Sequence, residues 1–215
     1  MHRLGAAAAA AIFSLGLLNS VSALACGTGK VQFEDKFTSL DPSWNFAATE
    51  ADRTVGPGGL TYVWKPNIGW TSLNQSGFYD DYEVCAQVSM TFAPNASGYI
   101  GVAFWGTDNN NLYTFDVSPV YGTYTIYRAQ KGKFLQPIKW TASDAIKKTS
   151  GDTNQVSVAL KGNHAVLSIN GTKIAEFNGQ PPDGGSLPGL DMSTSKNDTA
   201  DTTLNVKDFQ VLAVQ

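Results

Sequence analysis

The chain has 215 residues, a formal net charge of −3 and 42% hydrophobic residues. The few Lys and Arg residues are not clustered, which argues against a nucleic-acid-binding surface or an anionic-membrane surface. No stretch approaches the about 20 consecutive apolar residues of a transmembrane helix, so we expect no membrane insertion.

Residues 1–25 have the features of a secretory signal peptide. Residues 2–3 (His-Arg) give a basic start, residues 6–18 are mostly apolar, and residues 23–25 (Ala-Leu-Ala) fit the small-x-small cleavage pattern. The sequence therefore predicts a secreted or periplasmic protein whose mature chain begins at Cys26. Lipidation of Cys26 is an alternative, but residues 23–25 do not begin with the leucine that is usual before a lipidated cysteine.

Residues 26–215 are sufficient for one all-β sandwich domain. Cys26 and Cys85 are the only cysteines, and export favours a disulfide between them that stabilises the fold by roughly 4 kcal/mol. Because Cys85 lies on the polar face of its predicted strand, this bond would fasten the N-terminus to the outside of a sheet. The alternative is two unpaired thiols.

Alternating apolar and polar residues over 82–92 predict a long strand with one buried face. Three further strands are predicted at 99–105, 112–118 and 123–128, and the short polar segments between them favour antiparallel neighbours. The remaining predicted strands are 31–37, 60–64, 70–73, 134–140, 155–160, 165–169, 172–177 and 204–214. A helical turn is allowed only at 143–148. With no long helix and no dividing linker, the sequence predicts an all-β, two-sheet antiparallel β-sandwich of the jelly-roll type.

The order of several short segments supports a more specific comparison. These segments are 33–37 (FEDKF), 40–44 (LDPSW), 81–84 (DYEV), 101–105 (GVAFW), 111–115 (NLYTF), 122–124 (GTY), 126–128 (IYR), Trp140, 154–156 (NQV), 169–171 (ING) and 206–211 (VKDFQV). In this layout the chain resembles the concanavalin A-like, laminin-G-like β-sandwich domains of secreted bacterial proteins. It is similar to domains of the 3-keto-disaccharide hydrolase type and, more distantly, to family 16 glucanases.

Glycoside hydrolysis usually needs two carboxylates on either side of the scissile bond. In the glucanase branch of this resemblance they come from one strand with a Glu-x-Asp-x-x-Glu pattern, which this chain lacks. The nearest pair is Asp81 and Glu83, two residues apart on one strand face, where like charges raise each other's proton affinity. The alternative is a solvated strand end without catalytic role.

The resemblance also implies a structural calcium ion at the rim of the sandwich, held by oxygen ligands. The candidate ligands are Asp108 with residues 109–111, or Asp191 with Asn197, Asp198 and Asp201. Both compositions are also ordinary for turns. No other cofactor is expected, because His164 is the only histidine after residue 25 and no nucleotide-binding motif occurs.

Sugars stack on exposed aromatic rings, so outward-facing aromatics are candidates for a binding site. Strand alternation over 99–105, 112–118 and 123–128 predicts which side chains face outward. The predicted ligand platform consists of Trp105, Asp116, Tyr127 and, at its edge, Arg128. The alternative is that the second sheet or a loop covers this face. Trp44 and Trp140 are instead assigned to packing under loops.

These observations favour an exported, lectin-like module that binds a saccharide or cell-envelope glycan without catalysis. One alternative is a glycoside hydrolase-like enzyme that acts on a disaccharide or glucan. Another is a structural envelope protein without a small-molecule ligand.

Overall fold

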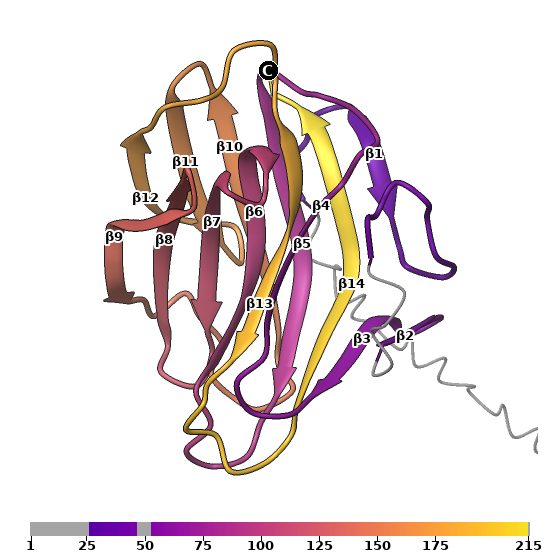
Figure 1. Ribbon diagram of the computed structural model, residues 1–215, viewed down its shortest axis with the longest axis vertical. Coiled ribbons are helices and arrows are strands. Elements are labelled where there is room, and N and C mark those ends of the chain that lie inside the picture. The colour runs from indigo at the N-terminus through magenta and orange to yellow at the C-terminus, as the bar shows by residue number, and fades with distance from the viewer. Residues whose placement is uncertain (1–25, 47–52, 215) are drawn as a thin grey trace, which may run out of the picture.

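The computed structural model describes residues 26–46 and 53–214, which form two antiparallel sheets packed face to face (Figure 1). The predicted all-β jelly-roll sandwich is therefore confirmed. Among these residues no helix is long and apolar enough to cross a membrane. The predicted signal peptide lies outside the described residues.

One sheet has eight strands and the other has six. The eight-stranded sheet has the order β12 (Thr172–Asn178), β11 (His164–Ile169), β10 (Thr153–Lys161), β5 (Tyr82–Thr91), β14 (Thr202–Ala213), β3 (Gly59–Trp64) and β2 (Arg53–Gly56), with β1 (Val31–Asp35) also paired to β14. The six-stranded sheet has the order β4 (Gly69–Leu73), β13 (Leu187–Thr194), β6 (Gly98–Asp108), β7 (Asn111–Ser118), β8 (Thr123–Gln130) and β9 (Lys133–Ala142).

The hydrophobic core lies between the two sheets, and β5 shows how the sequence produces it. Its apolar residues at alternate positions, Tyr82, Val84, Ala86, Val88 and Met90, are all buried in the core. On the facing sheet, β6 and β7 contribute their own alternate apolar residues to the same cluster. The period-two pattern predicted for 82–92 and for the strands that follow it therefore fixes which sheet faces meet.

Two strands were not predicted, and one predicted element is different. The strand β2 is a short edge strand of four residues. The strand β13 lies between β4 and β6; it contains Pro188 and Gly189, which are rare inside strands, and apolar and polar residues alternate only over residues 190–193. Residues 143–148 form a turn without a helix, with the amide of Ile146 donating to the carbonyl of Ser143 at 3.3 Å.

The predicted disulfide between Cys26 and Cys85 is present. The Cys85 side chain lies on the opposite face of β5 from the core residues and packs with Cys26 and Leu212 in a small separate cluster. The segment before β1 therefore crosses the outer face of the eight-stranded sheet, as the position of Cys85 predicted.

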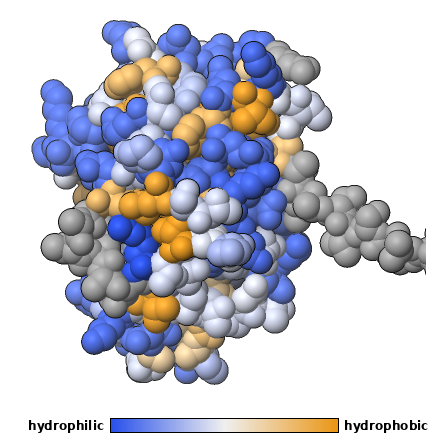
Figure 2. All heavy atoms as spheres, turned by 90° about the vertical axis from the view of Figure 1, so that its right-hand side faces the viewer, coloured by the Kyte–Doolittle hydropathy of each residue, from blue (hydrophilic) through white to orange (hydrophobic). Residues whose placement is uncertain are grey.

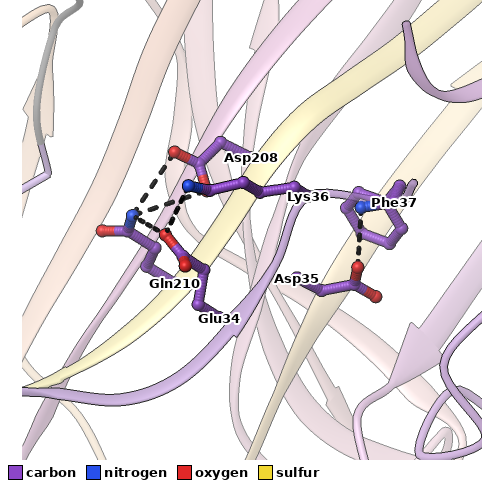
Figure 3. A network of polar contacts seen from close by, with 6 residues as sticks. All are labelled: Glu34, Asp35, Lys36, Phe37, Asp208 and Gln210. Atoms are coloured by element: carbon purple, nitrogen blue, oxygen red, sulfur yellow. Dashed lines mark hydrogen bonds and ion pairs between the residues drawn. The ribbon is translucent and has the colours of Figure 1, made fainter. Parts of the chain in front are cut away.

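A polar network joins β1 to β14 (Figure 3). Gln210 donates from Nε2 to Glu34 Oε1 at 2.9 Å, and Glu34 also forms an ion pair with Lys36 at 3.5 Å. Partial burial and the nearby Glu34 carboxylate raise the pKa of Asp208, which lies 3.3 Å from the same Gln210 nitrogen. These contacts fix the register of the added strand.

Asp35 anchors the loop that follows β1. Its two carboxylate oxygens accept hydrogen bonds from the backbone N–H of Phe37 at 2.6 Å and from the indole Nε1–H of Trp44 at 2.7 Å. Trp44 packs against Phe37 and Phe209, so its predicted packing role under a loop is confirmed. Desolvation by burial raises the pKa of Asp35.

The edge of the sandwich that carries β1, β2 and β3 has a mixed surface (Figure 2). Hydrophilic side chains predominate there, and the apolar ones occur in small separate patches. Scattered apolar residues of this kind are normal for a soluble protein surface. This view therefore gives no reason to place a docking surface on the described part of this edge.

Candidate functional site

A row of three residues crosses the middle of the six-stranded sheet. Asp191 on β13 is opposite Gly101 on β6, and Gly101 is opposite Asp116 on β7. The neighbours of Gly101 along β6, Ile100 and Val102, point into the core. Because side chains alternate along a strand, the row points to the outer face of this sheet.

Two hollows lie on this outer face, and together they form what we call the groove. The first, of about 450 Å³, is lined by Trp70, Thr71, Tyr99, Thr114, Tyr127, Phe134 and Asp191, among others. The second, of about 420 Å³, is lined by Ser97, Tyr99, Ser118, Tyr121, Thr123, Tyr127 and Trp140, among others. Tyr99 and Tyr127 line both hollows, so the two are adjacent. The predicted alternative that the second sheet covers this face is wrong.

Aromatic rings gather between the two hollows. The ring of Trp140 lies 6.0 Å from that of Tyr99 and 6.4 Å from that of Tyr127, measured between centroids. Trp140 is 39% exposed. The prediction that Trp140 packs under a loop is therefore wrong: it is a half-exposed residue of the groove, because β9 places it beside the outward-facing side chains of β6 and β8.

Asp191 lies at the floor of the groove, and a second carboxyl group, Asp116, is buried beside it. Asp116 is 0% exposed and Asp191 is 6% exposed. The Thr114 hydroxyl donates to Asp116 Oδ2 at 2.7 Å, and the Thr71 hydroxyl donates to Asp191 Oδ1. Gly101 between them has no side chain, so the two carboxyls meet over its backbone.

The buried surroundings of Asp116 and Asp191 raise the pKa of both carboxyl groups. Burial, and secondly the neighbouring Asp191 carboxylate, raise the pKa of Asp116 well above its ordinary value. Burial also raises the pKa of Asp191 to about 6, against the opposing hydrogen bonds from Thr71 and Asp116. Apart from Asp191, no donor of the described chain reaches Asp116 Oδ1. Asp116 is therefore the member of the pair that favours its protonated form, in which its carboxyl donates a hydrogen bond to Asp191.

Trp105 is not where the alternation predicted it. It is 3% exposed and packs in the core against Tyr113 and Phe177, at ring distances of 5.3 and 6.1 Å. Its φ angle is +47°, and the pairing of β6 with β7 shifts register between Phe104 and Asp108. An irregularity of this kind breaks the period of two, so the outward prediction for Trp105 is wrong.

Arg128 lies apart from Asp116 and Tyr127. Its guanidinium stacks over the ring of Tyr113 at 5.2 Å and donates to Gln180 Oε1 at 2.6 Å. Together with Trp105 it lines a different hollow, of about 250 Å³. The structure thus brings Asp116 and Tyr127 together on the predicted face and separates Trp105 and Arg128 from them.

The weak catalytic candidates lie on the other sheet. Asp81 precedes β5 and accepts a hydrogen bond from the backbone N–H of Gly162 at 2.7 Å. Glu83 lies on the outer face of β5, beside Gly27 of the N-terminal segment. Neither residue lines the groove, and both have structural neighbours typical of a strand end.

The residues predicted to bind calcium make hydrogen bonds that are typical of turns. Asp108 accepts hydrogen bonds from the Asn110 amide at 2.7 Å and from the Asn111 side chain, and these bonds lower its pKa. Asp198 accepts from Ser97, whereas Asp191 belongs to the groove. Among the described residues, no group of three or more His, Cys, Asp or Glu side chains is placed to hold a metal. The structural calcium ion at the rim of the sandwich stays a prediction.

Three groove residues were missed. Tyr99 was detectable, since it alternates with the inward-facing residues of β6 that follow it. Asp191 was considered only as a calcium ligand, because its strand was not predicted. Trp70 lies in the predicted strand 70–73, but only the long-range pairing of β4 with β13 brings it to the groove.

No protein-family profile matches the chain, and no curated protein does. The resemblance to 3-keto-disaccharide hydrolase-type domains therefore stays a prediction.

Solved structures with the same architecture do match. The carbohydrate-binding module CBM66 from Bacillus subtilis has a TM-score of 0.61 at 11% identity, covering 80% of this chain and 96% of that one. The β-glucanase of Bacillus licheniformis has a TM-score of 0.61 at 13% identity, covering 87% and 100%. The VIP36 exoplasmic domain, in a form bound to Ca²⁺ and Man3GlcNAc, has a TM-score of 0.60 at 8% identity, covering 81% and 84%. At these identities the likeness shows the fold alone: the chain has the jelly-roll architecture of glucanases and lectins.

Proposed function

We propose that this protein binds a saccharide without catalysis, in the groove on the outer face of the six-stranded sheet. The observation that carries the proposal is the cluster of Tyr99, Tyr127 and Trp140 between two adjacent hollows. Rings at such a position offer apolar faces to a sugar, while the polar groups beside them orient its hydroxyls. Thr71 and Asp191 supply such groups on the same surface.

The solved structures of the same fold support the proposal without deciding it. They are a carbohydrate-binding module, a β-glucanase and an exoplasmic domain bound to Ca²⁺ and Man3GlcNAc. We further propose that the protein is secreted or periplasmic, where a glycan ligand of the cell envelope is accessible. The disulfide supports this, since such bonds persist in oxidising compartments.

A direct test compares groove variants with a matched control. In isothermal titration with a glycan selected on an array, Trp140→Ala and Tyr127→Ala should each weaken binding about tenfold, which corresponds to a loss of ~1.4 kcal/mol. Phe78→Ala is the control, because Phe78 is 63% exposed and lies outside both hollows. The proposal is wrong if no glycan binds, or if both groove variants bind as tightly as the control. Absence of any glycan affinity would favour the structural envelope role.

A second candidate function is glycoside hydrolysis, and the position of Asp191 favours it. This carboxyl lines the first hollow, and its pKa of about 6 suits an acid or base near neutral pH. Against it, the only other carboxyl at the floor is Asp116, which is fully buried beside Asp191 and leaves no space for a glycosidic bond between the two. Release of reducing ends from a bound glucan or disaccharide, abolished by Asp191→Asn, would establish the enzyme.

A further inference from the structure

Within the described part of the chain, the residues that line the groove include only one charged side chain, that of Asp191. The described residues that line its two hollows include no Lys, Arg or His, and Asp191 is the only Asp or Glu among them. A single negative charge therefore lies at the floor of a surface that is otherwise made of aromatic rings, hydroxyls, amides and apolar groups. In a partly enclosed site such a charge is screened less than at an open surface.

The position of this charge depends on glycine. At Gly101 a Cβ atom would lie 1.9 Å from the carbonyl oxygen of Phe115, so a larger residue does not fit without displacing the backbone. The absent side chain lets carboxyls from strands on either side of β6 approach each other. Asp116 is fully buried, and its carboxyl group interacts with the Thr114 hydroxyl and with Asp191. The pair is thus built into the floor rather than placed on a flexible loop.

The groups around the pair accept protons or present electron-rich faces. Asp191 presents a carboxylate to the first hollow, and the faces of Tyr99, Tyr127 and Trp140 are negative in their quadrupole. Both kinds of group attract hydroxyl protons and cations such as an ammonium. Both repel a carboxylate or a sulfate.

We propose that the Asp116–Asp191 carboxyl pair is a specificity element of the groove: it accepts hydroxyl or ammonium protons from neutral and amino sugars, and it excludes sugars that carry carboxylate or sulfate groups. The inference rests on the proposed saccharide-binding function and narrows its ligand class. Asp191 touches the ligand, and Asp116 acts through it as a positioning residue.

The test uses the full mature chain on an array of neutral, amino-sugar, uronic-acid and sulfated glycans. The strongest neutral hit and its 6-carboxylate derivative are then titrated well above pH 6, where Asp191 is ionised. We expect the 6-carboxylate to bind at least about tenfold more weakly than the neutral sugar, since like charges that meet at a binding surface are strongly unfavourable. Asp191→Asn should narrow this difference several-fold, whereas Asp183→Asn, which removes an exposed carboxylate outside both hollows, should not.

A salt series on the unaltered protein keeps the test decisive if Asp191→Asn fails to fold. Rising ionic strength should narrow the preference for the neutral over the acidic sugar and should weaken amino-sugar binding. Equal or tighter binding of the acidic derivative overturns the specificity inference and leaves the saccharide-binding function standing. An array without any hit overturns the proposed function, and the inference with it.

Discussion

Replacing Asp191 by Asn should change how the stability of the fold depends on pH. In the folded protein the pKa of Asp191 is raised from 3.8 to about 6, mainly by burial. The folded state therefore binds this proton more tightly than the unfolded state. The resulting stabilisation is fully present below about pH 4 and is lost as the pH rises through 6. Its size is about 3 kcal/mol, since each pKa unit corresponds to ~1.4 kcal/mol.

Urea denaturation followed by tryptophan fluorescence, repeated from pH 4 to pH 7, measures this effect. The free energy of unfolding of the unaltered protein should fall across this range by about 3 kcal/mol more than that of Asp191→Asn. The perturbed carboxyls Asp35 and Asp208 are common to both proteins and cancel in the difference, whereas loss of the Asp191 carboxylate lowers the pKa of Asp116 and can only enlarge it. Asp183→Asn serves as the matched control with an unchanged profile. Parallel curves for the unaltered protein and Asp191→Asn would refute the assignment of a buried, proton-binding carboxyl at this position.

Three further variants test the architecture by the same denaturation assay. Cys85→Ser should lower the free energy of unfolding by about 4 kcal/mol, because the bond to Cys26 closes a loop with a sequence separation of 59; a loss below 1 kcal/mol would contradict this. Asp35→Ala should cost about 1–3 kcal/mol by leaving the Phe37 N–H and the buried Trp44 indole N–H without acceptors, while Asp35→Asn, which keeps an acceptor for one of the two donors, should cost less. Trp105→Ala should cost about 3–5 kcal/mol as a core truncation. It should leave the glycan affinity of the folded protein unchanged, and a selective loss of affinity would return Trp105 to the binding site.

The fold was largely predictable because most of its strands are buried on one face only. In β5, Val84 and Val88 alternate with Glu83 and Gln87, and this pattern identifies both the strand and its core-facing side. The strand β13 was not predicted because Pro188 and Gly189 are typical of loops, and the alternation from Leu190 to Ser193 is too short to identify a strand without its neighbours.

The site was predictable only in part, because it depends on pairing between distant segments. Asp116 and Tyr127 were placed on the correct face by local alternation alone. The partner of Asp116 comes from β13, and only the antiparallel pairing of β13 with β6 brings Asp191 to Gly101. The prediction for Trp105 was wrong because the alternation rule was applied across an irregular stretch. Trp105 has a positive φ there, which the local sequence does not reveal.

The two outer faces of the sandwich differ in a way that bears on function. The N-terminal segment and the bond from Cys26 to Cys85 cover part of one face, and this arrangement stabilises the fold. The other face carries buried carboxyls at Asp116 and Asp191, whose desolvation lowers stability at neutral pH. A sandwich of this size needs no buried charge in order to fold, and local features that oppose stability tend to occur at functional sites. The carboxyl pair is therefore better explained by ligand binding in the groove than by a contribution to the stability of the sandwich. The pH dependence of the free energy of unfolding tests whether the pair is destabilising at neutral pH. The preference for neutral over acidic sugars tests whether the pair acts in binding.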